Sequence, residues 1–191
     1  MDPFPNPPDR RAEDRISWAL KTRAESLTLG DLDLTELPES IGALRDLLEL
    51  DLAHQPALHY GCNLSDLTGA IGGARQLRQL NLTCNQLTTL PATIGQLARL
   101  RRLKLGLNRL ANLPDSIGAL AELEFLDLSD NYLKALPASF RELRGLKALF
   151  LHGNDALDLP AEILGPEWDE VEQHGAHPAD PAAILDYYFR R

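Results

Sequence analysis

The chain has 191 residues, of which 44% are hydrophobic and 25% are charged, and its formal net charge is −9 at pH 7. This length and balance are typical of one soluble domain with its own core. No apolar run approaches the ~20 residues that a membrane-spanning helix needs, and an acidic chain binds a phosphate backbone poorly. We therefore expect neither a membrane nor a nucleic acid as a partner.

The N-terminal end predicts a leader and then a helix. Residues 1–8 are rich in proline and contain no apolar signal-peptide core, which predicts a flexible leader. Residues 9–23 predict a short amphipathic helix with Asp9 as its N-cap. Its apolar residues recur at spacings of three and four and so share one face: Ala12, Ile16, Ala19 and Leu20. We interpret this helix as a cap over the repeats that follow; an independent partner-binding helix is the alternative.

A unit of 23 residues recurs along most of the chain, and its first leucines are Leu77, Leu100, Leu123 and Leu146. A fixed period of this size indicates a solenoid, in which each unit is one supersecondary element. Within the unit, Leu-x-x-Leu-x-Leu places two leucines in the alternation of a strand with one buried face. We assign six units to residues 24–164, with an insert at 53–61 in the second unit.

The full unit, Leu-x-x-Leu-x-Leu-x-x-Asn-x-Leu-x-x-Leu-Pro-x-x-Ile-Gly-x-Leu, resembles the leucine-rich repeat family. The resemblance implies an α/β solenoid: a horseshoe with a parallel β-sheet on its concave face. It also implies extended or short 3-10 segments on the convex side and helical caps at both ends. In this family the concave face binds protein, so the resemblance implies a protein partner there.

Most units place an asparagine in the turn after the strand, where its amide can satisfy buried backbone groups. We assign a structural role to Asn85, Asn108, Asn131 and Asn154, and to Cys62 at the same place in the second unit. The other cysteine, Cys84, should point towards the surface, which disfavours a disulfide between the two. Extracellular members of the family usually carry cysteine-rich end caps, which this sequence lacks. We therefore expect a cytoplasmic protein; export as a bacterial effector into a host cell is the alternative.

The regular repeats end before residue 165, and we interpret residues 165–191 as a C-terminal cap. Residues 165–180 are polar, acidic and interrupted by Gly and Pro. A helix is predicted from about residue 181, with Asp180 as its N-cap and Pro181 at its first position.

The sequence lacks the motifs that carry catalysis or hold cofactors. It has no phosphate-binding loop, no dinucleotide fingerprint and no nucleophile elbow. His54, His59 and Cys62 lie close together in the sequence. However, we assign a structural role to Cys62, and the two remaining histidines are too few ligands for a metal site. We therefore predict no enzyme, no cofactor and no metal.

The variable positions of the strands predict a binding surface on repeats four to six. Leu107, Phe125 and Phe150 are apolar where a solvated face is expected, and charged residues flank them. An aromatic centre with a charged rim is typical of binding hot spots. The predicted partner-binding residues are Arg102, Lys104, Leu107, Phe125, Asp127, Asp130, Phe150 and His152, with His54 and Tyr60 from the insert. The alternative is that the aromatic residues pack on the terminal segment 165–191.

The leading hypothesis is a non-catalytic protein-interaction module that binds a protein partner through its concave face; a homodimer is compatible with the sequence. The alternative is a regulatory, sensing or dimerising repeat domain of a larger signalling protein. This alternative is based on a resemblance to the boundaries of repeat domains in bacterial Roco-type GTPases. Two segments carry the resemblance: the terminal ILDYYFRR, and the opening helix followed by SLTLGDLDLTELPESIG. The excess of Arg over Lys is typical of a bacterial protein from a GC-rich genome.

Overall fold

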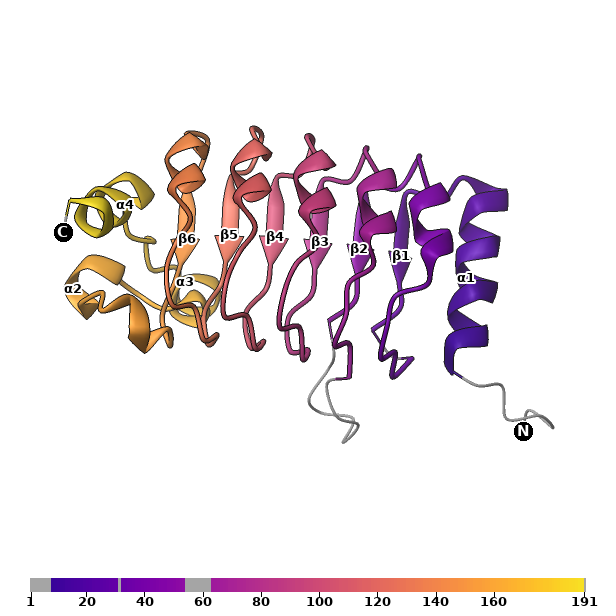
Figure 1. Ribbon diagram of the computed structural model, residues 1–191, viewed down its shortest axis with the longest axis horizontal. Coiled ribbons are helices and arrows are strands. Elements are labelled where there is room, and N and C mark those ends of the chain that lie inside the picture. The colour runs from indigo at the N-terminus through magenta and orange to yellow at the C-terminus, as the bar shows by residue number, and fades with distance from the viewer. Residues whose placement is uncertain (1–7, 31, 54–62, 191) are drawn as a thin grey trace.

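The computed structural model describes residues 8–30, 32–53 and 63–190, with side chains from residue 11. Figure 1 shows the elements in one row, with α1 at one end and α2, α3 and α4 at the other. The predicted leader as far as residue 7 lies outside the described residues. Most of the predicted insert does too, including His54 and Tyr60, and so does Cys62, which was assigned a structural role.

In the described ranges, six three-residue strands form one parallel sheet whose spatial order follows the chain. The strands are β1 Ser26–Thr28, β2 Glu49–Asp51, β3 Gln79–Asn81, β4 Arg102–Lys104, β5 Phe125–Asp127 and β6 Ala148–Phe150. The central residue of each strand is a buried leucine that pairs in register with the leucine of the next strand. The alternation of the sequence therefore sets the register, because a slip by one residue would turn every leucine outward.

Short 3-10 turns form the opposite side of the first five repeats, as predicted, and the short helix α2, Ala161–Leu164, takes their place in the sixth. The turns are η1 Glu39–Ala43, η3 Gly69–Gly73, η4 Ala92–Gln96, η5 Asp115–Ala119 and η6 Ala138–Glu142. A proline precedes most of them, with φ close to the angle that its ring imposes, as at Pro91 with φ −66°. Adjacent turns pack closely: a Cβ atom on Gly95 would collide with the carbonyl oxygen of Ser116 in the next repeat. The structure is thus the predicted leucine-rich solenoid.

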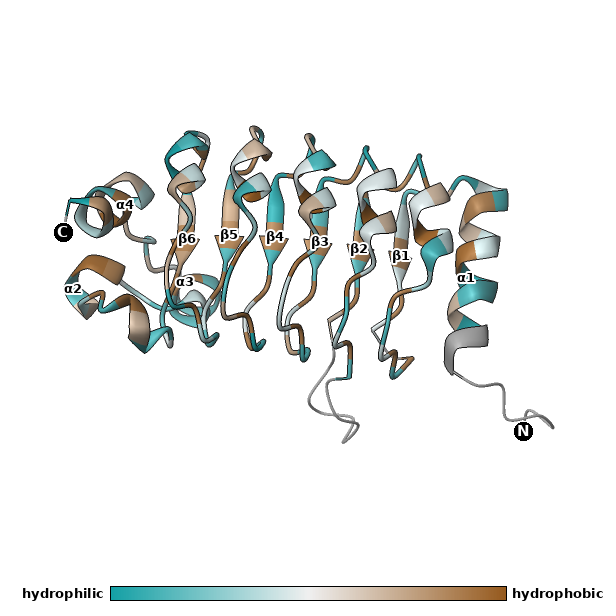
Figure 2. Ribbon diagram, viewed as in Figure 1, coloured by the Kyte–Doolittle hydropathy of each residue, from teal (hydrophilic) through white to brown (hydrophobic). Residues whose placement is uncertain are grey.

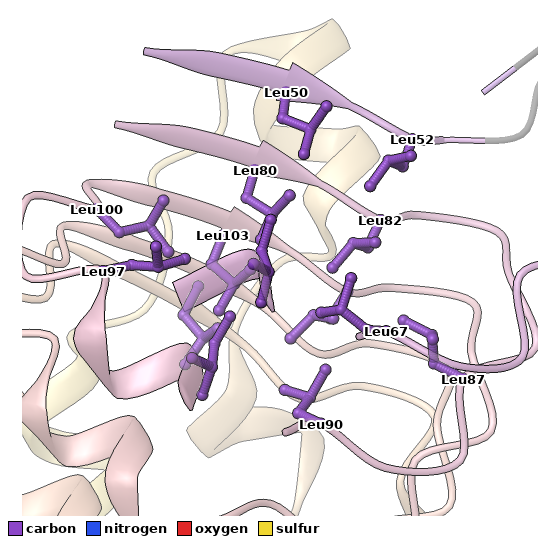
Figure 3. Packing of buried hydrophobic residues seen from close by; sticks show 14 of the residues in the cluster. Leu50, Leu52, Leu67, Leu80, Leu82, Leu87, Leu90, Leu97, Leu100 and Leu103 are labelled. Atoms are coloured by element: carbon purple, nitrogen blue, oxygen red, sulfur yellow. The ribbon is translucent and has the colours of Figure 1, made fainter. Parts of the chain in front are cut away.

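The core lies between the sheet and the 3-10 turns and runs through all the repeats. Leucines of neighbouring strands point into the same interior as leucines of the return segments (Figure 3): Leu50, Leu80 and Leu103 from the strands, and Leu97 and Leu100 from the return side. Each such leucine contributes roughly 1.5–3 kcal/mol by its burial. The contribution depends on the neighbouring repeat, since no repeat can cover its own leucines.

A buried asparagine in the turn after each of β3–β6 joins consecutive repeats. The side-chain amide of Asn131 donates hydrogen bonds to the carbonyl oxygens of Leu105, Leu128 and Ser129, at 2.9, 3.1 and 3.1 Å. Its Oδ1 accepts one from the backbone N–H of Leu110 at 2.9 Å. The same four-bond pattern recurs at three other positions: Asn85, Asn108 and Asn154. One side chain thereby satisfies backbone groups of two repeats that no strand ladder reaches.

The helix α1, Pro8–Thr22, packs at the open edge of the first repeat. Its residues Ala12, Ile16 and Ala19 are buried in the main core. Leu20 is 51% exposed, so its predicted place on the buried face is wrong. Each residue turns the helix by about 100°, which puts Leu20 at the edge of the stripe. The helix begins at Pro8, so Asp9 lies in its first turn and is not the N-cap.

Three helices close the other end: α2 Ala161–Leu164, α3 Trp168–His174 and α4 Pro181–Phe189. The helix α4 begins where the sequence predicts, and the Asp180 carboxylate accepts a hydrogen bond from the backbone N–H of Ala182 at 3.0 Å. Ile184 of α4 is buried, and the Tyr188 hydroxyl accepts a hydrogen bond from the Leu136 N–H at 3.0 Å. The helix α3 falls within residues 165–180, for which the sequence pattern indicated no helix.

Asn131→Ala should lower the free energy of unfolding by about 3 kcal/mol, because the change leaves buried carbonyl and N–H groups without partners. Urea denaturation measures the loss. Asn112→Ala, at an exposed position of the preceding repeat, is the matched control and should stay within about 0.5 kcal/mol of the wild type. Similar losses for both variants would contradict the assigned role.

Candidate functional site

The outward face of the sheet is open over β1–β4 and closed over β5 and β6. In β1–β4 the first residue is exposed and the third is exposed or half-buried, whereas all residues of β5 and β6 are buried. Figure 2 shows the open pattern clearly in β4, where hydrophilic residues flank a hydrophobic centre. We call the outward side chains of β1–β4 the open concave face.

The helix α3 closes the face over β5 and β6. The Trp168 ring lies 4.7 Å from the Phe125 ring and 5.5 Å from the Phe150 ring, between centroids, in edge-on geometry. Phe125 is 5% exposed and Phe150 is 1% exposed, and with Ala148 they form a small core that Trp168 and Val171 cover. The expectation that the two phenylalanines are open to a partner is therefore wrong for this structure. The terminal segment covers them because a tryptophan on α3 buries apolar area that would otherwise face water.

Two cations mark the border between the open and the closed part. The Lys104 ammonium lies 4.6 Å from the centroid of the Trp168 ring, and the Arg102 guanidinium lies 5.1 Å from that of Phe125. Both distances fit cation–π attraction. Arg102 remains exposed and Lys104 is half-buried, so both predicted binding residues lie beside the open face.

Asp127, predicted at the charged rim, is buried on β5 and 3% exposed. Its Oδ1 accepts hydrogen bonds from the backbone N–H and the hydroxyl of Ser129. Burial raises the pKa of Asp127, while the hydrogen bonds from Ser129 and the charge of Lys104 act in the opposite direction. This carboxylate therefore belongs to the packed end of the face.

Leu107 and Asp130 lie on a different surface, at the edge of the sheet where the strands end. A groove of about 590 Å³ there is lined by residues of the third to sixth repeats, and we call it the rim groove. Its lining residues include Leu107, Arg109, Asp130, Tyr132 and Gly153. Leu107 is 51% exposed and Tyr132 is 68% exposed. Sequence reasoning missed Tyr132, although an aromatic residue directly after the turn asparagine was a usable signal.

His152 holds the start of the terminal segment. Its Nε2 lies 3.0 Å from the carbonyl oxygen of Gly165, and the ring is half-buried. The structure therefore brings this predicted residue to the cap rather than to an open surface. His54 and Tyr60 lie outside the described residues.

A second pocket, of about 440 Å³, lies at the edge of the sheet where the strands begin. Its charged lining residues are Arg78, Arg101, Arg102, Glu124 and Lys147. Its apolar wall comes from β5 and the terminal segment: Phe125, Trp168, Val171 and Pro178. We call it the basic pocket. Sequence reasoning placed only Arg102 and Phe125 of this set in a binding surface.

None of the described helices is long and apolar enough to cross a membrane. Within the same residues, no group of three His, Cys, Asp or Glu side chains is arranged to hold a metal ion.

The family model for the leucine-rich repeat region matches residues 75–165. The chain is a leucine-rich repeat protein. A search of curated proteins finds no match.

Solved structures share its fold. A leucine-rich repeat protein of Leptospira interrogans is 32% identical with a TM-score of 0.52, over 68% of this chain and 42% of that one. The plant peptide hormone receptor RGFR1, in complex with RGF2, is 26% identical with a TM-score of 0.54, over 68% and 23%. A TDR receptor is 25% identical with a TM-score of 0.54, over 62% and 20%. The leucine-rich repeat protein thus spans less than half the length of each. The family and these neighbours support a protein-interaction module in general.

Phe150→Ala should lower the free energy of unfolding by about 3 kcal/mol, because the change empties a packed site beneath Trp168. Chemical denaturation measures this in a Trp18→Phe background, where Trp168 is the only tryptophan and its emission reports its burial. Tyr132→Ala, at an exposed position, should change stability by less than about 0.5 kcal/mol. A stable Phe150→Ala protein with unchanged Trp168 emission would contradict the described packing.

The raised pKa of Asp127 predicts a pH dependence of stability with a definite sign. The folded chain binds this proton more tightly than the unfolded chain does. The resulting stabilisation is fully present below the ordinary pKa of 3.8 and is lost as pH rises through the raised value. The stability of the wild type relative to Asp127→Asn should therefore fall as pH increases from about 3.5 to 7. Urea midpoints over this range measure it, and a rise would contradict the assignment.

Proposed function

We propose that the leucine-rich repeat protein is a non-catalytic module that binds a protein partner across the open concave face and the adjoining rim groove. The observation that carries this proposal is Leu107, an exposed apolar side chain on a backbone conformation that leucine disfavours. The low cysteine content supports a reducing compartment such as the cytoplasm, including that of a host cell.

Leu107 has φ +57°, in the left-handed region. The equivalent positions of the neighbouring repeats are also left-handed and carry Cys84, Asp130 and Gly153, with φ between +51° and +68°. The left-handed conformation costs a residue with a Cβ atom about 1 kcal/mol, and less for asparagine or aspartate. A leucine here is unfavourable for the turn and also exposes apolar surface. Recognition of a partner accounts for both features.

Tyr132 gives the rim groove a second anchor. Exposed aromatic and aliphatic side chains in a groove with a polar surround are typical of the centre of an interface. Arg109 and Asp130 supply charges of both signs in the same groove. The groove adjoins the ends of β4 and β5, so one partner can contact it together with the open concave face.

A second candidate function is a sensing or dimerising repeat domain of a larger signalling protein, of the Roco-like GTPase or bacterial effector type. The observation in its favour is that the similar solved structures extend well beyond the matched part. Sequencing the genomic locus tests it: an open reading frame that continues past Arg191 into a GTPase or effector domain supports this candidate.

Leu107→Asn should weaken partner capture and at the same time raise the free energy of unfolding by about 0.5–1 kcal/mol, since asparagine tolerates the left-handed backbone. Affinity capture with quantitative mass spectrometry, beside urea denaturation, measures both effects. Leu20→Asn is the matched control, because Leu20 is also 51% exposed but lies on α1. The proposal expects proteins that the wild type and Leu20→Asn capture and that Leu107→Asn loses. Identical capture by all three would overturn it.

A further inference from the structure

We propose that the basic pocket binds an acidic segment of the protein partner, with carboxylates on Arg78 and Arg102 and an apolar side chain against the wall that Trp168 and Phe125 form. The inference rests on the proposed function and names the chemistry of the partner at a second place on the same face.

Only some of the charged side chains that line the basic pocket form ion pairs. Arg101 pairs with Glu122 outside the pocket at 3.2 Å, and Lys147 pairs with Glu124 at 2.7 Å. In the described part of the chain, neither Arg78 nor Arg102 has a carboxylate oxygen within 4 Å. Arg102 instead lies over the Phe125 ring. Two guanidinium groups therefore face the pocket with donors available for a carboxylate.

The surroundings of Glu124 reflect the same excess of positive charge. Its pKa lies below the ordinary value, first because of the hydrogen bond and charge of Lys147, and then because of Arg101 and Arg102. An anion in this pocket meets the same field. This positive electrostatic field is local to the pocket, because the chain as a whole has a formal net charge of −9.

The charge of the open concave face changes along the sheet. The in-register first residues of β2, β3 and β4 are Glu49, Gln79 and Arg102. The third residues repeat the change from acidic through amide to basic: Asp51, Asn81 and Lys104. A partner with an acidic segment therefore gains at β4 and is repelled at β2, which gives it one orientation on the face.

The chain's own terminal segment shows that this surface accepts an aromatic anchor. The helix α3 places Trp168 on the phenylalanines and beside Lys104, and its neighbours Asp169, Glu170 and Glu172 are acidic. An aromatic anchor beside a cation, carried by an acidic helix, thus already occupies the closed end of the sheet. The basic pocket is the adjacent part of the same surface that α3 leaves open.

A polypeptide fits the pocket better than a nucleic acid does. The net charge of −9 repels a polyanion over distances of about the Debye length, ~10 Å, whereas a short acidic segment meets mainly the local arginines. The apolar wall of Trp168, Val171 and Pro178 offers contact area to an aliphatic or aromatic side chain.

The test uses the full chain in a Trp18→Phe background, so that fluorescence reports on Trp168 in the pocket wall. The probe is an end-capped, fluorescently labelled peptide of glutamates around one phenylalanine. We expect saturable binding that shifts Trp168 emission and weakens as salt increases. Replacing the glutamates by glutamine should weaken binding about tenfold or more. The Arg78→Glu, Arg102→Glu double variant should lose the same factor, because it reverses both recognising charges.

The matched control is the Arg45→Glu, Arg75→Glu double variant. It carries the same charge change at exposed positions that follow η1 and η3 and do not line the pocket, and it should bind the peptide as the wild type does. Equal binding of the glutamate and glutamine peptides would overturn the proposal. So would an equal loss in both double variants, or tighter binding of a single-stranded oligonucleotide than of the peptide.

Partner capture run in parallel separates this inference from the proposed function. If capture depends on Leu107 but the acidic peptide does not bind, the acidic-segment proposal fails and the interaction module stands. If the peptide binds through Arg78 and Arg102 while Leu107→Asn captures what the wild type captures, the rim groove fails and the pocket stands.

Discussion

The stacking of three-residue strands is the constraint on which the rest of the structure depends. A strand such as β4 turns only Leu103 towards the core, and it cannot remove that leucine from water without a neighbouring repeat on each side. The buried asparagines have the same dependence, since Asn131 bonds to backbone groups of two repeats. Stability is therefore a property of adjacent pairs of repeats, and both ends of the row need elements that are not repeats.

The two ends meet this need differently, and the difference shapes the surface. The helix α1 covers the first repeat with small and branched residues and leaves the outward sheet face untouched. At the other end, α4 covers the core while α3 turns onto the outward face and buries Phe125 and Phe150. The consequence is an asymmetric face: it is open as far as β4 and changes from acidic at β2 to basic at β4, and it is closed over β5 and β6.

The repeat, its register, its 3-10 turns and its asparagine turns could be predicted because each depends on a pattern that recurs in the sequence. The position of α3 could not. Trp168 and Val171 are apolar residues in an acidic stretch, and their partners lie on β5 and β6, 18 or more residues earlier. The same contact explains the error at the candidate site, because composition alone cannot tell a phenylalanine awaiting a partner from one that the chain covers itself. Tyr132 and Arg78 were missed because each stands at a polar position where single residues carry no periodic signal.

Leu107 is a residue that the packing of the fold does not explain and that binding of a partner does. Every other departure from the repeat at the far end has a packing explanation: Leu157 is buried where Ala156 takes the usual leucine position, and the phenylalanines pack under Trp168. Leu107 has none, since its side chain is half exposed and its backbone lies where glycine or asparagine is more stable. A solenoid tolerates that cost locally, because the strained backbone is confined to one turn. Asn108 and Asn131 still join this repeat to its two neighbours by hydrogen bonds. The repeats therefore supply the rigidity. A residue that destabilises its repeat and gains no packing contact in return marks the surface where we expect a partner to bind.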